Sequence, residues 1–481
     1  MQMKERGAAI RAYLENKREE IAGVLSALAA IPSVKGEATA DAPCGVACKE
    51  ALDLALATCR EAGAATVGRG CYGLADFGEG EAHVGIFTHL DVVPAGDGWK
   101  ETAPFTPCQK GDYLFGRGVT DDKSGFVAAL YAYRALADLS LAPKHRVRIF
   151  LGADEESGMC DIGQFLKDEE RLPDVSLVPD GSFPVSAGEK GICRFSVNSP
   201  QFTDVLSVKG GVALNVVLAH VEVLLNDKAG LYEEIAALVE GDDDLSVKRT
   251  DDGILLLAEG IPSHASMPEH SKNAFYGAAR LLSGVRALAP ADREIFREAA
   301  SLLKDSYGTA FGIATEDEAF GRLTATNGIV SGGGDKGLYL TFDVRYGTGI
   351  SAEELERRVL QTVKGVGLGW RGEIMENDRG FKIPADSPYL ALFCRVYSEA
   401  SGKPCVPQYM GGGTYARHLP TAFSIGTSAP YVEGAFIDPE DDNRIHSADE
   451  YIHIPAFLEA VALVAEMLLA ADAVLSEKEG K

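Results

Sequence analysis

The sequence predicts an α/β fold in which a mostly parallel sheet is interrupted by an inserted α+β domain. Up to Asp180, short apolar runs typical of strands alternate with segments of helical spacing, as in parallel strands joined by right-handed crossovers. The pattern changes between about residues 188 and 380, and the alternation returns after Pro388. We therefore expect one discontinuous domain from residues 1–187 and 381–481, with an inserted domain at residues 188–380.

The individual elements follow from apolar spacing. Apolar residues at three- and four-residue steps predict one helix that ends before Pro32. Further helices of the discontinuous domain are expected at residues 48–62, 124–139, 388–400 and 454–475. Its strands are expected at residues 84–88, 147–151, 175–178 and 422–425. In the inserted domain, strands are expected at 253–258 and 338–345, and helices at 274–288 and 352–363.

Composition limits the class of protein. The chain of 481 residues is 46% hydrophobic and 24% charged, which suits a globular protein of two or three domains. A net charge of −25 argues against nucleic acid or an anionic membrane as a partner. The nine cysteines are scattered without a Cys-x-x-Cys pair, which fits a reducing cytosol. The N-terminus is too charged for a signal peptide, and no uninterrupted run of eighteen apolar residues occurs. We expect a cytoplasmic protein without a membrane partner.

Potential metal ligands follow three of the expected strands directly. His89 and Asp91 follow the first, the acidic triplet at 154–156 follows the second, and Asp180 follows the third. The carboxyl ends of parallel strands line one crevice, so these side chains can converge there. One histidine and several carboxylates in a cleft indicate a divalent metal site.

Three motifs also have simpler interpretations. His89 and Asp91 are equally compatible with a hydrogen-bonded surface pair, although Asp91 could instead hold the second imidazole nitrogen. In the turn at 116–125, a helix N-cap explains one aspartate but leaves the adjacent pair Asp121-Asp122 unexplained. The triplet at 154–156 could be a solvated loop, but three acids beside a buried strand repel one another unless a cation offsets them.

The charges suggest two metal ions. Asp121, Glu156 and Asp180 supply three negative charges, and one bridging hydroxide with two divalent cations brings the sum to zero. Such a pair of ions generates hydroxide near neutral pH and polarises a carbonyl, which suits amide hydrolysis. Glu155 is then free to act as the general base. We expect the second imidazole from residues 444–450, where His446 precedes the last helix.

Taken together, the motifs resemble the dinuclear metallohydrolases that include the aminoacylases, carnosinases and succinyl-diaminopimelate desuccinylase. The resemblance covers nearly the whole chain. It is carried by the sequences His-x-Asp-Val-Val-Pro at 89–94, Gly-Arg-Gly-x-x-Asp-Asp-Lys at 116–123, Asp-Glu-Glu-Ser-Gly at 154–158 and His-x-x-Asp-Glu at 446–450. Further motifs at 179–185, 189–191 and 411–417 are most similar to the dipeptidase V subgroup, which is also described as manganese-dependent.

The resemblance implies a role for each matching position. His89 and Asp180 would bind one ion, Glu156 and His446 the other, and Asp121 would bridge them. Asp91 would orient His89, Glu155 would be the general base, and the Asp121-Asp122 peptide bond would be cis. Zinc is expected first, with manganese or cobalt as alternatives.

The inserted domain would then be a lid over a catalytic domain. His264 matches a lid histidine that stabilises the oxyanion, with an ordinary loop histidine as the alternative. The positions that match substrate-binding residues are Asn215, Arg345, Gly412, Gly413, Tyr415 and Arg417. The resemblance implies a monomeric dipeptidase whose substrates are dipeptides, because in dipeptidase V the extra half of the lid replaces a partner subunit. An N-acyl amino acid deacylase is the alternative, and Ser124, Gly347 and Gly426 depart from the usual motifs without touching a ligand.

Overall fold

The computed structural model describes residues 3–438 and 442–479, and the chain forms two compact units. The first unit comprises Met1–Gly188, Ile383–Gln408 and Thr414–Lys481. The second comprises Glu189–Lys382 and Tyr409–Gly413. The segment expected at residues 188–380 thus makes up most of the second unit. The sequence had placed the short stretch 409–413 in the discontinuous domain instead.

The first unit is built on a mixed sheet that is parallel at its centre. The sheet has the order β1-β2-β6-β3-β7-β21-β8. Its strands are β1 (Ala65–Gly68), β2 (Tyr72–Phe77), β3 (His83–His89), β6 (Arg146–Gly152), β7 (Val175–Gly181), β8 (Ser186–Glu189) and β21 (Ala422–Gly426). The pairs β6-β3, β3-β7 and β7-β21 are parallel, whereas β1-β2, β2-β6 and β21-β8 are antiparallel. The α/β class is therefore confirmed, with antiparallel flanks that the strand and helix alternation did not reveal.

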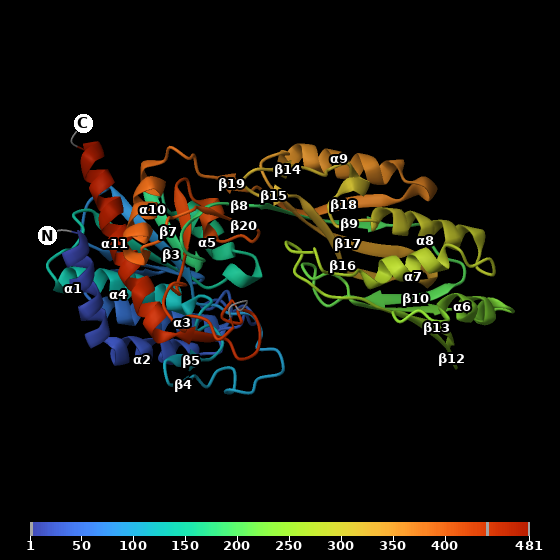
Figure 1. The fold of residues 1–481 in the computed structure, drawn as a ribbon, viewed down its shortest axis with the longest axis horizontal. Helices are drawn as coiled ribbons and strands as arrows, with labels where there is room; N and C mark the ends of the chain where they lie inside the picture. Colours follow the sequence, from blue (N-terminus) through green and yellow to red (C-terminus); the bar gives the residue numbers. More distant parts are fainter. Residues whose placement is uncertain (1–2, 439–441, 480–481) are drawn as a thin grey trace. The chain divides into compact units, whose positions relative to one another are not determined.

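Helices cover this sheet and carry much of the core (Figure 1). They are α1 (Met3–Asn16), α2 (Arg18–Ala29), α3 (Val46–Glu61), α4 (Lys123–Asp138), α5 (Cys160–Asp168), α10 (Pro388–Ser401) and α11 (Ile454–Glu479). A small sheet of β4 (Cys108–Lys110), β5 (Tyr113–Phe115) and β22 (Tyr451–His453) lies at the start of α11. The short strands β19 (Phe381–Lys382) and β20 (Gln408–Met410) lie where the chain passes between the units.

Helix α11 is apolar on most sides because it packs on several of them. It contacts α1, α4 and α10, and a helix surrounded by other helices needs apolar residues all round. By length and composition it could cross a membrane, alone among the described helices, but 78% of its apolar window is buried inside the protein. Its composition is accounted for by the core of the first unit.

The register of the central strands brings their carboxyl ends to one edge. His89, the last residue of β3, pairs with Gly152, the last residue of β6. On the other side of β7, Gly181 pairs with Gly426. The segments that follow β3, β6 and β7 therefore start side by side, which is the convergence that the sequence predicts.

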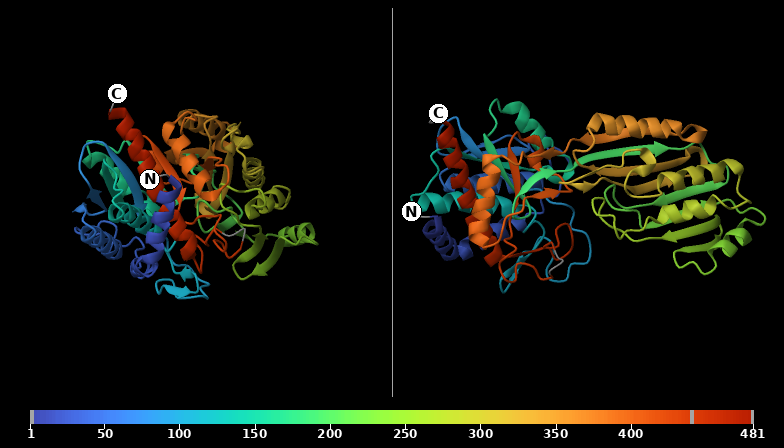
Figure 2. Two further views of the ribbon diagram at one scale, coloured as in Figure 1. Left: turned by 60° about the vertical axis from the view of Figure 1, so that its left-hand side comes forward. Right: turned by 45° about the horizontal axis from the view of Figure 1, so that its top comes forward.

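The second unit is an antiparallel sheet with helices along one face (Figures 1 and 2). The sheet has the order β12-β13-β11-β10-β16-β17-β9-β18. Its strands are β9 (Gly191–Asn198), β10 (Val205–Gly210), β11 (His220–Leu225), β12 (Leu245–Thr250), β13 (Gly253–Glu259), β16 (Thr324–Gly332), β17 (Leu338–Tyr346) and β18 (Arg371–Asp378). The helices are α6 (Leu231–Val239), α7 (Ala274–Leu282), α8 (Pro290–Leu302) and α9 (Ala352–Gly365). The hairpin of β14 (Glu316–Asp317) and β15 (Gly321–Arg322) stands beside the sheet.

Two expected helices differ from the structure. The first expected helix is divided at Lys17 into α1 and α2. The helix expected at 274–288 ends at Leu282, and the chain then turns before α8 begins. Val285 and Leu288 continue the apolar spacing because both are buried in that turn. Their spacing therefore indicates burial in the core and not helical structure.

Candidate metal centre

The carboxylate of Asp121 lies between two imidazoles, one facing each of its oxygens. His89 Nε2 is 3.0 Å from Asp121 Oδ1, and His446 Nε2 is 2.8 Å from Asp121 Oδ2. Asp180 Oδ2 lies 3.8 Å from the same nitrogen of His89, and Glu156 Oε1 lies 3.2 Å from that of His446. Ligand atoms of each triplet, His89 with Asp121 and Asp180, and Asp121 with Glu156 and His446, lie within 4.8 Å of one another. All five predicted ligands are thus gathered around one shared carboxylate.

Electrostatics in this group are dominated by buried acids. Burial, with Asp121 next, raises the pKa of Asp180 well above its ordinary value, and the same two causes raise the pKa of Glu156. Burial would lower the pKa of His446, but contacts with Asp121 and Glu156 outweigh this and raise it to about 11. Burial would raise the pKa of Asp121, yet His446 and His89 lower it far below its usual range. A cation at this position would relieve the repulsion between these acids.

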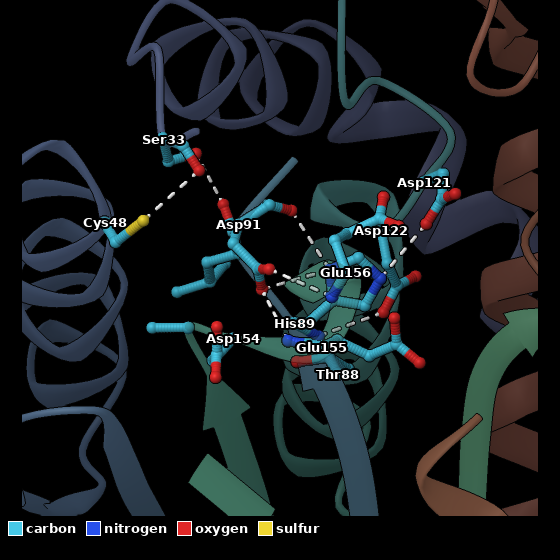
Figure 3. A network of polar contacts seen from close by, with 12 residues as sticks. Ser33, Cys48, Thr88, His89, Asp91, Asp121, Asp122, Asp154, Glu155 and Glu156 are labelled. Carbon is cyan, nitrogen blue, oxygen red and sulfur yellow. Dashed lines mark hydrogen bonds and ion pairs between the residues drawn. The ribbon is translucent and has the colours of Figure 1, made fainter. Parts of the chain in front are cut away.

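His89 is oriented through its other ring nitrogen, as Figure 3 shows. Nδ1 lies 3.0 Å from the main-chain oxygen of Asp91, and 3.5 Å from the carboxylate of that residue. The carboxylate of Asp91 instead accepts hydrogen bonds from the amides of Glu155 and Glu156, each at 3.1 Å. The orienting contact expected from the carboxylate therefore comes mainly from the carbonyl. The carboxylate holds the loop that carries the two glutamates.

A second buried carboxylate, Asp161, holds the first half of the same loop. Its Oδ2 accepts the amides of Ala153 and Asp154 at 2.7 and 2.8 Å, and the hydroxyl of Tyr415 at 2.5 Å. Burial and the neighbouring Asp91 raise the pKa of Asp161 to about 6. The contacts leave no room beside β6, because a Cβ on Gly152 would lie 1.9 Å from the Tyr415 hydroxyl. Asp91 and Asp161 together bind four consecutive amides, from residue 153 to 156.

A third carboxylate holds the turn that presents Asp121. Glu450 is fully buried, and its Oε1 accepts the amides of Thr120 and Asp121 at 2.9 and 3.2 Å. Its Oε2 accepts the amide of Gly118 at 3.1 Å and Arg117 Nη1 at 2.7 Å. The peptide bond between Asp121 and Asp122 is cis, as the resemblance implies. The sequence motif His-x-x-Asp-Glu contains Glu450 but predicts no separate role for it. The feature that could have revealed this role is an acid four residues after a proposed ligand histidine.

Lys123 is another residue whose role was missed. Its side chain is fully buried, and Nζ donates to the carbonyls of Leu28 and Ile31 at 3.0 and 2.8 Å. Burial lowers the pKa of Lys123 to about 7. Leu28 lies in the last turn of α2 and Ile31 just after that helix, so Lys123 ties the start of α4 to the end of α2.

Glu155 is an acid beside this group with an open oxygen. Its Oε1 is buried and has no hydrogen-bond partner among the described residues. Burial, followed by the charge of Asp180, raises the pKa of Glu155 well above its ordinary value. An unpartnered carboxylate oxygen beside a group of metal-ligand residues can accept a proton from a water molecule.

Tyr415 and Arg417, which were expected at a substrate pocket, lie in the first unit just after the glycine-rich turn. Tyr415 is fully buried, its ring packs edge-on to Phe150, and its hydroxyl is used by Asp161. These contacts favour a role in positioning the acidic loop over contact with a substrate. Arg417 is half-buried in the short helical turn Tyr415–His418.

The remaining expected substrate residues belong to the second unit. His264 is exposed, and its Nδ1 lies 2.7 Å from Ser266 Oγ. Asn215 is half-buried, and its carbonyl accepts the amide of Ala265 at 2.8 Å. Gly412 and Gly413 lie beside Gly411 in the short segment that the second unit takes from the C-terminal part.

Arg345 differs from its expected state. Its guanidinium is buried but already paired, with Nε 2.5 Å and Nη2 3.1 Å from the two oxygens of Asp343. Nη1 donates to the carbonyl of Gly411 at 3.3 Å. Asp343 therefore compensates the charge of Arg345 within the second unit.

Comparisons with known proteins agree with this geometry. A family model described as Peptidase family M20/M25/M40 matches residues 85–470. A protein of Staphylococcus epidermidis named "Putative dipeptidase" is 28% identical over 473 residues, covering 95% of this chain and 97% of that protein. Human carnosine dipeptidase 1 has a similar structure, with a TM-score of 0.59 at 14% identity, over 97% of this chain and 99% of that chain. The dipeptidase Dug1p of Saccharomyces cerevisiae gives a TM-score of 0.56 at 13% identity, over 97% and 98% of the two chains.

Proposed function

The chain belongs to peptidase family M20/M25/M40, and from this premise we propose that it hydrolyses the peptide bond of dipeptides with two divalent metal ions. It is a peptidase of a metal-dependent family whose relatives include proteins named as dipeptidases. We propose the specific substrate, the number of ions and the roles of the individual residues.

The observation that carries the proposal is the shared carboxylate of Asp121. Each of its oxygens faces one imidazole nitrogen within 3.0 Å, and each imidazole has one further acid beside it. Nitrogen and carboxylate donors in this number suit zinc, manganese or cobalt. The residues therefore fit two ions: one held by His89 and Asp180, the other by His446 and Glu156, with Asp121 shared between them. Zinc is the ion we favour.

Two such ions, when bound, supply Lewis acidity toward the scissile carbonyl and make a water molecule easier to deprotonate. Glu155 then takes the proton from that water at Oε1, the atom that is buried and unpartnered among the described residues. The same carboxyl returns the proton to the leaving amine. Asp91 keeps Glu155 in place through its amide, so that the base and the adjacent ligand Glu156 move as one rigid loop.

The second unit would supply the substrate contacts. We propose that His264 donates to the oxyanion, because its side chain is exposed and the contact of its Nδ1 with Ser266 Oγ orients the ring. Asn215, Arg345, Gly412, Gly413 and Arg417 are proposed to bind the dipeptide, with Arg345 using the part of its guanidinium that Asp343 does not occupy. We further propose a monomer in the cytoplasm.

The test of the substrate uses metal-free protein restored with zinc, manganese or cobalt. Dipeptides and N-acetyl amino acids that share a C-terminal residue are assayed side by side. The proposal expects restored activity and faster hydrolysis of the dipeptides. Faster hydrolysis of the N-acetyl compounds would assign an N-acyl amino acid deacylase instead.

The test of the roles uses Glu155→Gln, with Glu79→Gln in an exposed loop as the matched control. Loss of a general base lowers turnover by at least about 10²-fold, while the metal content should remain at two ions per chain. The control should match the wild type. A loss of metal equal to the loss of turnover would make Glu155 a ligand, and binding that never exceeds one ion per chain would contradict the paired centre.

A further inference from the structure

Two thiols and a carboxylate meet at the start of α5, outside the centre described above. Ligand atoms of Cys44, Asp154 and Cys160 lie within 4.8 Å of one another. Cys44 and Asp154 are buried, whereas Cys160 is exposed. The thiol of Cys71, which is also buried, is a neighbour of that of Cys160. The group is therefore a compact, thiol-rich set of donors, open to solvent at Cys160.

Asp154 belongs to this group and not to the group around Asp121. Its Oδ2 accepts the amide of Cys160 at 3.1 Å, and its Oδ1 lies 2.6 Å from Lys35 Nζ. Its own amide is held by Asp161. The side chain of Asp154 thus contacts Cys160 and Lys35, so the first acid of the triplet at 154–156 has a different use from the other two.

The charges of the group sum to zero when a divalent ion is added. Cys44 and Cys160 as thiolates and Asp154 as a carboxylate carry three negative charges, and the ammonium of Lys35 beside Asp154 offsets one of them. A divalent cation offsets the other two. Without it the thiols stay neutral, because burial, followed by neighbouring acids and thiols, raises the pKa of Cys160 to about 12 and that of Cys44 still higher.

The donor set also selects the kind of ion. Thiolate sulfur favours zinc and other soft ions, whereas carboxylate with imidazole also accepts manganese and cobalt. Two sulfurs and one oxygen leave one tetrahedral position, which water or the Cys71 thiolate can take. The separations of up to 4.8 Å require only a small inward movement of the exposed Cys160 to reach bonding distance.

We propose that Cys44, Asp154 and Cys160 form a separate, thiolate-rich site for a thiophilic divalent ion, zinc or cadmium. The ion replaces the two thiol protons, which pass to the solvent, and no change of oxidation state is involved. The site adjoins the loop that carries Glu155 and Glu156, and its occupation would fix the first residue of that loop.

The experiment is a Cd²⁺ titration of the full chain with a phosphine reductant, followed by the ultraviolet absorption of thiolate-to-cadmium charge transfer. This band reports only thiolate ligands, so it is independent of the proposed paired centre. The wild type should show the band and bind one more Cd²⁺ than the double variant Cys44→Ser with Cys160→Ser. The matched control, Cys394→Ser with Cys405→Ser, removes another pair of neighbouring thiols and should keep the band.

Asp154→Asn keeps both thiols and should weaken Cd²⁺ binding by at least about 10-fold, the scale on which supporting groups alter metal affinity. Absence of the band in the wild type, its persistence in the Cys44 and Cys160 double variant, or its loss in the control would each overturn the proposal. If the double variant fails to fold, alkylation of Cys160 in the wild type decides. A Cd²⁺ concentration near ten times the dissociation constant should slow alkylation about 10-fold, and an unchanged rate would refute the site.

Discussion

Replacing Tyr415 by phenylalanine separates a positioning role from contact with the substrate. The change removes only the hydroxyl that donates to Asp161 Oδ2 at 2.5 Å and leaves the ring packed on Phe150. A hydrogen bond to a charged group contributes about 1.5–3 kcal/mol. Asp161 keeps the amides of Ala153, Asp154 and Ile162, so the lower half of that range applies.

The expected loss in the free energy of unfolding is therefore about 1.5–2 kcal/mol, equivalent to roughly 10- to 30-fold in the unfolding equilibrium. The loss should depend on pH. The folded-state pKa of Asp161 is already raised, to about 6, and the Tyr415 hydroxyl counteracts that rise. Without the hydroxyl the pKa rises further, so the deficit of the variant grows as the pH increases through about 6.

Urea unfolding measures the stability, and steady-state kinetics on a dipeptide separate kcat from KM. KM should stay within about 2-fold, because the hydroxyl is bound inside the first unit. Tyr72→Phe is the matched control, because the hydroxyl of that buried residue donates to the exposed Asp168 at 2.8 Å. This variant should lose less than about 1 kcal/mol of unfolding free energy. A rise in KM of about 10-fold with unchanged stability would refute the positioning role and restore Tyr415 to the substrate pocket.

Three further outcomes follow from the structure and the proposed function. The protein should sediment as a monomer, and mixing His264→Ala with Glu155→Gln protein should restore no activity; an obligate dimer or recovered activity would place the histidine in trans. Dipeptides should be cleaved faster than their amides, with Arg345→Ala removing the preference, whereas equal rates in the wild type would exclude a carboxylate contact. Burial lowers the pKa of His145, but Asp472 and Glu479 raise it overall. The stabilisation from the His145–Asp472 pair is therefore complete below the unfolded-state pKa of about 6.5, and it is lost as the pH rises through the folded-state pKa. Asp472→Asn should thus cost more stability near pH 6 than near pH 9, and an equal cost in urea unfolding at both would contradict this.

Much of the first unit could be predicted because its strands end at charged residues. The apolar runs before His89, Asp154 and Asp180 correspond to β3, β6 and β7, and the parallel pairing of these strands fixed where their ends meet. The break between α1 and α2 was not predictable in the same way. Lys17 is an ordinary helix former and apolar spacing continues on both sides, so only packing shows where the axis changes.

The ligand group was easier to predict than its support. His89, Asp121 and Glu156 occur in dense polar motifs, whereas the use of Asp161 and Tyr415 depends on hydrogen bonds across 254 positions of the chain. Such contacts leave no periodicity. The same holds for Cys44 and Cys160, whose sequence separation matches no metal motif.

The spacing of the acidic motifs has a physical explanation in this arrangement. Each segment that carries a proposed ligand also carries, or faces, a carboxylate whose oxygens are taken up by backbone amides. Asp91 follows His89 and binds the amides of Glu155 and Glu156, and Glu450 follows His446 and binds the amide of Asp121. Amide donors stabilise these supporting acids inside the protein, where no cation is needed. The acids around Asp121 face the imidazoles of His89 and His446 instead, and we propose that a pair of cations compensates their charge.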